Sequence, residues 1–162
     1  MIDKFAFNDK LTVGIENTDN NKHIFIWGNA RPEPQPRITR RSRFANKHHA
    51  KYISWRNEMR DLLKSRLKEL WFPEDAKLGM SCKFGAKQNK ATRKNKDGSA
   101  DKRTMKDIYN ADLANYLKAW EDVCNGIVYK DDKQIRLYDS CTADDNTRNY
   151  FWLYIWTLKE NN

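Results

Sequence analysis

The last apolar stretch of the chain, Tyr150-Phe-Trp-Leu-Tyr-Ile-Trp-Thr-Leu158, constrains the fold more than any other segment. It is apolar on both of the faces that alternate along a strand, so neither face suits water. The stretch therefore predicts a central β-strand, or a strand whose second face is covered by another element or subunit. Trp152, Tyr154 and Trp156 share one face and could stack bases, but packing in the core or in a dimer is the favoured interpretation.

The rest of the chain mixes the two hydrophobic periodicities, of about 2 and about 3.6 residues, that are typical of strands and helices. The first predicted elements are a buried strand at 23–28 and a helix at 51–70 that ends before Pro73. A half-buried strand at 78–84, with its polar face in solvent, follows them. The last part of the chain predicts a helix at 112–124 with a left-handed cap at Asn125-Gly126, and then short strands at 127–129 and 134–138 joined by a turn.

These elements predict an α+β fold in which a small mixed β-sheet packs against two main helices. At 162 residues with 39% hydrophobic residues, the chain fits one domain with a real core. Residues 23–162 are assigned to that domain. Residues 1–22 alternate only weakly and are expected to form an N-terminal extension or an accessory hairpin.

The positive charge is concentrated in two segments without apolar periodicity, the basic loops 29–51 and 86–106. The chain has a net charge of +9, yet outside these two loops it is slightly acidic. Local basicity of this kind indicates a nucleic acid or another polyanion as partner, the alternative being solvated lysine loops. The candidate DNA-binding residues are Arg31, Arg37, Arg40, Arg41, Arg43, Lys47, Lys87, Lys90, Arg93, Lys94, Lys96, Lys102 and Arg103.

The three cysteines, Cys82, Cys124 and Cys141, have no CxxC spacing. Their odd number argues against a disulfide framework or a zinc knuckle and suits a reducing compartment. The N-terminus lacks a continuous apolar signal segment, and no run is long enough to span a membrane. We therefore expect a soluble, cytoplasmic protein with no membrane partner.

Acids, an amide and a lysine are gathered between residues 112 and 134. On a helix, Asp112, Asn115, Lys118, Ala119 and Asp122 fall on the side opposite the apolar residues. The following strand and turn could bring Asp131-Asp132 back towards that polar face. Carboxylates beside a lysine suit metal-dependent phosphodiester hydrolysis, in which a divalent cation activates water and the lysine neutralises phosphate. An ordinary solvated helix face is the alternative.

These residues resemble the RusA family of phage-type Holliday-junction resolvases, whose motif reads roughly Asp-x-Asp-Asn-Leu-x-Lys-Ala and then Asp-Asp-x-Gln. The resemblance covers about residues 23–158. It implies a homodimer that makes paired nicks across four-way DNA junctions. The nicking would depend on Mg²⁺, with Mn²⁺ as an alternative ion. It also implies a protein of a bacterial host cell, encoded by a phage or prophage. It also implies roles for single residues: Asp112 and Asp132 as metal-binding catalytic acids, Lys118 as the lysine beside the phosphate, and Asn115, Asp122 and Asp131 as supporting residues.

One departure from the family motif falls on its second acid, which is Ala114 here. A methyl group can neither bind Mg²⁺ nor orient water, so the chain is expected to be catalytically impaired. Two explanations compete: a deliberate Asp-to-Ala change that traps the enzyme, which the otherwise intact motif favours, and a natural member that binds junctions without cutting them. The rival functions are a nucleic-acid-binding protein without catalysis and a structural protein that uses its aromatic strand.

Overall fold

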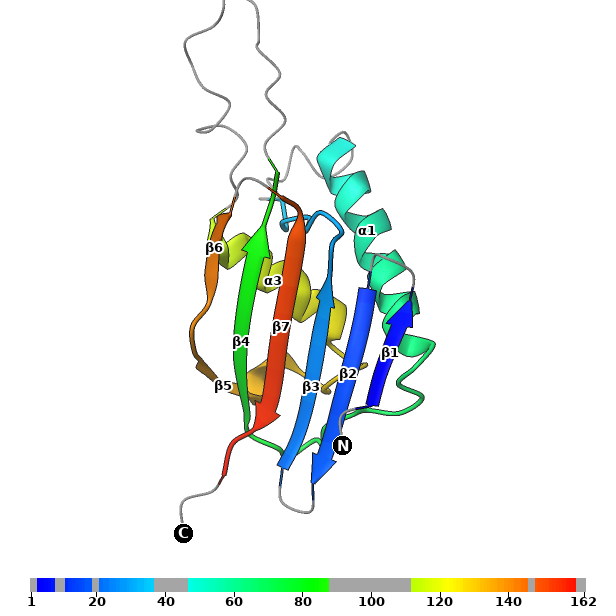
Figure 1. The fold of residues 1–162 in the computed structure, drawn as a ribbon, viewed down its shortest axis with the longest axis vertical. Helices are drawn as coiled ribbons and strands as arrows, with labels where there is room; N and C mark the ends of the chain where they lie inside the picture. The colour runs from blue at the N-terminus through cyan, green and yellow to red at the C-terminus, as the bar shows by residue number, and fades with distance from the viewer. Residues whose placement is uncertain are drawn as a thin grey trace, which may run out of the picture.

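The computed structural model describes residues 3–7, 11–18, 21–36, 47–87, 112–145 and 148–159. These residues form a mixed seven-stranded sheet with two α-helices on one of its faces (Figure 1). The strands are β1 (Asp3–Phe7), β2 (Leu11–Thr18), β3 (Asn21–Gly28), β4 (Leu78–Gly85), β5 (Ile135–Tyr138), β6 (Thr142–Asp145) and β7 (Tyr150–Thr157). Their order is β1-β2-β3-β7-β4-β5, with β6 also paired to β4. The predicted α+β class is confirmed.

Strand β7 lies in the middle of the sheet, antiparallel to both β3 and β4. Its side chains divide as strand geometry requires, with Phe151, Leu153 and Ile155 buried beneath the helices. The prediction of a central strand is confirmed. Trp152 and Tyr154, on the opposite face, are only half-buried, and Figure 1 shows no helix on that side of the described chain.

The half-buried aromatic rings on that open face pack against one another. Tyr154 stacks on Phe25 of β3 at 4.6 Å and on Trp156 at 4.9 Å between ring centroids. Trp156 also lies over Gly79, where an added Cβ would come within 2.4 Å of its ring. Because the rings cover β4, Gly79 and Ser81 are buried, and the prediction of a solvent-exposed polar face on this strand is wrong except at Lys83.

Helix α1 (Lys47–Lys64) ends six residues earlier than its apolar spacing predicted. Turns follow it, beginning where Arg66 N and Leu67 N both donate to Leu63 O. Leu67 is nevertheless buried, so the apolar spacing correctly marked core residues that a turn, rather than a helix, delivers.

Helix α3 (Leu113–Cys124) has the predicted extent, with Asp112 as its N-cap. Ala119 is fully buried, so its placement on the polar face is wrong. The predicted strand at 127–129 is also wrong: Ile127 N and Val128 N both donate to Cys124 O, which closes a tight turn. Gly126 has the left-handed φ of 72° that the predicted cap requires.

Residues 3–7 and 11–18 extend the same sheet, because β1 pairs with β2 and β2 pairs with β3, each antiparallel. Division of the chain into 1–22 and 23–162 stays a prediction. Strand β6 was not anticipated and runs parallel to β4. Within the described part of the chain, no helix is long and apolar enough to cross a membrane.

The core lies between the sheet and the two helices. Trp120 of α3 packs edge-on against Trp55 of α1 at 5.4 Å and against Phe151 of β7 at 4.5 Å between ring centroids. Trp120 and Phe151 are fully buried. This aromatic contact fixes α3 against the sheet, and α3 carries most of the candidate site.

Candidate active site

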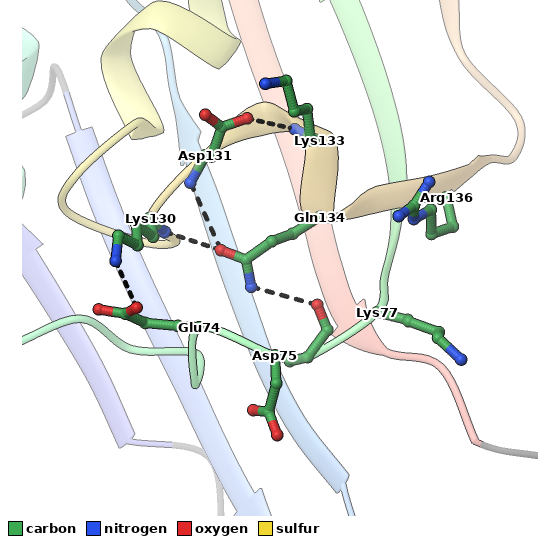
Figure 2. Close-up of a pocket in the computed structure, with 9 residues that line it drawn as sticks. Glu74, Asp75, Lys77, Lys130, Asp131, Lys133, Gln134 and Arg136 are labelled. Atoms are coloured by element: carbon green, nitrogen blue, oxygen red, sulfur yellow. Dashed lines mark hydrogen bonds and ion pairs between the residues drawn. The ribbon is translucent and has the colours of Figure 1, made fainter.

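The turn between α3 and β5 that contains Asp131 and Asp132, called the acidic turn below, is held in place by Gln134. Asp131 caps the 3₁₀ helix η1 (Asp132–Gln134), and its carboxylate accepts from Lys133 N at 2.9 Å. The Gln134 carbonyl oxygen accepts from Lys130 N at 2.9 Å, and its amide donates to the main-chain oxygens of Pro73 and Ala76, as Figure 2 shows in part. Buried Gln134 therefore joins two loops and orients the acids that precede it.

A surface pocket lies beside this turn (Figure 2). It is lined by Glu74, Asp75, Ala76, Lys77, Lys130, Asp131, Lys133, Gln134 and Arg136. Its lining mixes the basic residues Lys77, Lys130, Lys133 and Arg136 with the acids Glu74, Asp75 and Asp131, so the pocket carries both signs of charge. The catalytic residues expected from the sequence lie elsewhere, on α3 and Asp132.

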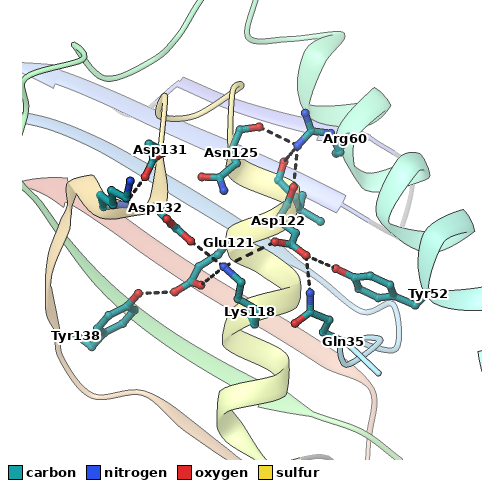
Figure 3. A network of polar contacts seen from close by, with 12 residues as sticks. Gln35, Tyr52, Arg60, Lys118, Glu121, Asp122, Asn125, Asp131, Asp132 and Tyr138 are labelled. Carbon is teal, nitrogen blue, oxygen red and sulfur yellow. Dashed lines mark hydrogen bonds and ion pairs between the residues drawn. The ribbon is translucent and has the colours of Figure 1, made fainter. Parts of the chain in front are cut away.

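Lys118 joins the two halves of the acidic motif. Its ammonium donates to Asp132 Oδ2 at 2.7 Å (Figure 3). This hydrogen bond lowers the pKa of Asp132, and the same contact raises the pKa of Lys118. The prediction that the turn folds back to the polar face of the helix is confirmed for Asp132.

Glu121 is a member of this cluster that sequence reasoning missed. Its carboxylate is buried and accepts hydrogen bonds from the Tyr138 hydroxyl and, at 3.4 Å, from Lys118 Nζ. Burial first and the bond to Glu121 second raise the pKa of Tyr138. The i,i+3 spacing from Lys118 was a signal for Glu121; the contact with Tyr138 depends on how β5 packs.

Asp122 ties three parts of the chain together. Its Oδ2 accepts from the Tyr52 hydroxyl at 2.7 Å and from Gln35 Nε2 at 2.9 Å, while its Oδ1 lies 3.9 Å from Lys118 Nζ (Figure 3). Gln35 N also donates to Asn115 O at 3.0 Å. The Asp122 carboxylate and the Asn115 carbonyl thus hold Gln35, in the proline-rich segment 32–36, against α3.

Asp112, the N-cap of α3, and Ala114, in the first turn of α3, are both exposed. Asp112 Oδ1 accepts from Asn115 N at 3.1 Å, the usual N-cap bond. Position 114 is one helical turn before Lys118, so an acid there would neighbour the ammonium. Ala114 offers only a methyl group at that point, beside the ion pair with Asp132.

The described residues do not make up a complete metal site. Among them, no three His, Cys, Asp or Glu side chains are grouped so as to hold a metal ion. Asp112 Oδ1 accepts from Asn115 N, Asp132 Oδ2 accepts from Lys118 Nζ, and residue 114 is an alanine. Mg²⁺ takes near-octahedral oxygen coordination and is commonly held by one or two protein carboxylates with water and substrate phosphate, so Asp112 and Asp132 could supply only part of its coordination.

Only part of the predicted DNA-binding set can be placed. Burial raises the pKa of Tyr116 on α3, and the positive charge of Arg31 opposes that rise. Lys87 N donates to Asn149 Oδ1 at 2.8 Å near the end of β4, and Lys47 begins α1. The others lie outside the described residues: Arg37, Arg40, Arg41, Arg43, Lys90, Arg93, Lys94, Lys96, Lys102 and Arg103.

A known protein family matches most of this chain. No curated protein matches the chain. Residues 28–148, which include β3 Gly28, both helices and the acidic turn, match the family profile described as Endodeoxyribonuclease RusA. That family comprises endonucleases that resolve Holliday junctions. Because the match covers most of the sequence and both halves of the acidic motif, this chain belongs to the RusA endodeoxyribonuclease family.

Proposed function

We propose that this chain binds four-way and branched DNA junctions and that its paired nicking of them is impaired by Ala114. The observation that carries the proposal is the 2.7 Å contact between Lys118 and Asp132. It brings the two halves of the family motif together on one face of α3, with a methyl group one turn before the lysine. In this proposal α3 and the acidic turn form the scaffold of a junction nuclease, and Ala114 stands where that nuclease would carry one of its carboxylates.

Residue roles within the proposal follow from these contacts. Asp132, Asp112 and the absent acid at position 114 are the proposed metal-binding set, and Lys118 is the proposed phosphate neighbour. Gln35 and Tyr52 support Asp122, whose position suits a scaffold role. We expect Mg²⁺, or Mn²⁺ in its place, to be needed for cleavage once position 114 carries an acid.

Junction binding is proposed to rest on the basic loops and on a homodimer that matches the two-fold symmetry of the DNA. Ala114 lies outside those loops, so its methyl group leaves the phosphate contacts intact. If about six to ten phosphates are neutralised, the association constant should fall steeply between low and physiological salt. An affinity that does not change with salt would contradict this part of the proposal.

The test is cleavage of a synthetic four-way junction by the wild-type chain and by Ala114→Asp, with Mg²⁺ and with EDTA. Ala114→Asp should cut at least about 100-fold faster, the scale on which one transition-state charge contact acts, and should nick symmetrically. Ala143→Asp is the matched control, since Ala143 is exposed on β6 and lies outside both basic loops. If that control cuts as fast, the role given to position 114 is wrong.

A second function, junction binding without catalysis, is favoured by one further observation. The Lys118 ammonium already lies within 2.7 to 3.9 Å of carboxylate oxygens of Asp132, Glu121 and Asp122. A lysine whose positive charge is already balanced by neighbouring carboxylates is less available to a phosphate. If both the wild type and Ala114→Asp bind the junction tightly and neither cuts it, this second function stands.

A further inference from the structure

Two of the three cysteines lie next to each other in the sheet. Cys82 is on β4 and Cys141 precedes β6, and these parallel strands pair Lys83 with Thr142 one residue further along. Adjacent strands lie about 4.8 Å apart, a separation within the range of about 4.4–6.8 Å between Cα atoms that a disulfide spans. Cys141 Sγ donates to Met80 O of β4 at 3.8 Å, and burial first and the neighbouring Cys141 thiol second raise the pKa of Cys82.

The two thiols differ in their access to solvent. Cys82 is fully buried in the core, whereas Cys141 is half-buried. Burial raises the pKa of Cys82 above that of an ordinary thiol, which disfavours the reactive thiolate, and burial also keeps reagents in solvent away from its sulfur. Cys141 is therefore the point of entry for a reagent, and Cys82 is reached only through it. Cys124, fully buried in α3, is a natural internal control.

We propose that Cys82 and Cys141 form a reversible intramolecular disulfide when the protein meets a hydroperoxide. The Cys141 sulfur attacks the O–O bond of hydrogen peroxide, which breaks and leaves a sulfenic acid and water. The Cys82 sulfur then attacks the Cys141 sulfur: the S–S bond forms, the S–O bond breaks, and the hydroxyl leaves as a second water with the Cys82 proton. The two sulfurs lose two electrons, which reduce the peroxide.

The position of this bond connects it with the candidate active site. Asp139 N donates to Met80 O at 2.9 Å beside Cys141, and Tyr138 before it donates to Glu121. A disulfide would fasten the segment that supports Glu121 to β4. The oxidised chain should also unfold at a higher urea concentration, because the bond closes a long loop in the unfolded state.

The test is peptide mapping of the full reduced chain after treatment with hydrogen peroxide and alkylation of the remaining thiols. We expect a linked peptide that contains Cys82 and Cys141, alkylated Cys124, and recovery of all three thiols with dithiothreitol. In Cys141→Ser the Cys82 thiol should stay unmodified, and in Cys82→Ala a sulfenic acid at Cys141 should be trapped by dimedone. The control Cys124→Ala should keep the link.

Two results would overturn the inference. One is oxygen added at Cys141 in the wild-type chain while Cys82 is still alkylated in full. The other is a link that joins two chains rather than one. Both are read from wild-type peptides, so a variant that fails to fold does not leave the question open, and neither depends on nuclease activity.

Discussion

The ammonium of Lys118 lies 2.7 Å from Asp132 Oδ2, across 14 residues of sequence that contain a helix end and two turns. Each partner changes the pKa of the other in the direction that favours the charged pair. The contact brings α3 and the acidic turn, which carry the two halves of the motif, together in one candidate site. It also makes the pair a measurable reporter of that site.

Lys118→Gln should reduce stability only slightly at neutral pH, by less than about 1 kcal/mol, because Lys118 is 43% exposed. The ion pair with Lys118 lowers the folded-state pKa of Asp132. The pair therefore stabilises the folded state fully above the unfolded-state pKa of about 3.9, and this stabilisation is lost as the pH falls through the folded-state pKa. Urea unfolding at pH 2–7 should thus show a smaller acid-induced loss in Lys118→Gln than in the wild type. Equal losses would mean that the ion pair does not form in solution.

Gln134→Leu should destabilise the protein by about 2–4 kcal/mol. It leaves the carbonyls of Pro73 and Ala76 and the amide of Lys130 without their partner inside the structure. Gln134→Glu keeps the shape but removes both donors, so it should also be destabilising. Urea denaturation measures both variants, and Lys133→Gln, at a fully exposed neighbour, is the control. Near-neutral Gln134→Glu would contradict the donor role.

Tyr52 and Asp122 should be energetically coupled by about 1 kcal/mol through their 2.7 Å hydrogen bond. A double-mutant cycle of Tyr52→Phe and Asp122→Asn measures that coupling by urea unfolding. Gln35→Ala removes the other hydrogen-bond donor to Asp122 Oδ2, so it tests the support of Asp122 independently of Tyr52. Additive effects of the two single changes would show that Tyr52 does not hold Asp122.

Gly79→Ala should cost about 1–3 kcal/mol, since its Cβ would lie 2.4 Å from the Trp156 ring. Trp156→Leu should relieve much of that cost in the double variant. Gly126→Ala is a useful contrast, because nothing lies within 4 Å of its Cβ and only the positive φ opposes it, at about 1–2 kcal/mol. If the double variant shows no relief, the packing of Trp156 over β4 is not what requires glycine.

Sequence reasoning succeeded where local patterns decide structure. The apolar run at 150–158 predicted a central strand, or one covered on its second face, and it is the central strand β7. The amphipathic spacing at 112–124 correctly predicted α3. It failed where packing overrides pattern. The apolar spacing after Lys64 continues as if helical, but turns deliver those residues to the core. The alternation in β4 suggested a wet face, which aromatic rings from β7 cover instead.

The sequence by itself determined the family resemblance, the alanine at position 114 and the set of candidate site residues, because residue type and helical spacing are local properties. Only the tertiary structure decided which of these groups meet. Lys118 reaches Asp132 because Gln134 locks the acidic turn, Glu121 enters the cluster because β5 brings Tyr138 to it, and Asp122 is held by Tyr52 from another helix. These contacts depend on elements far apart in the chain, whose relative positions are set by burial of the common aromatic core.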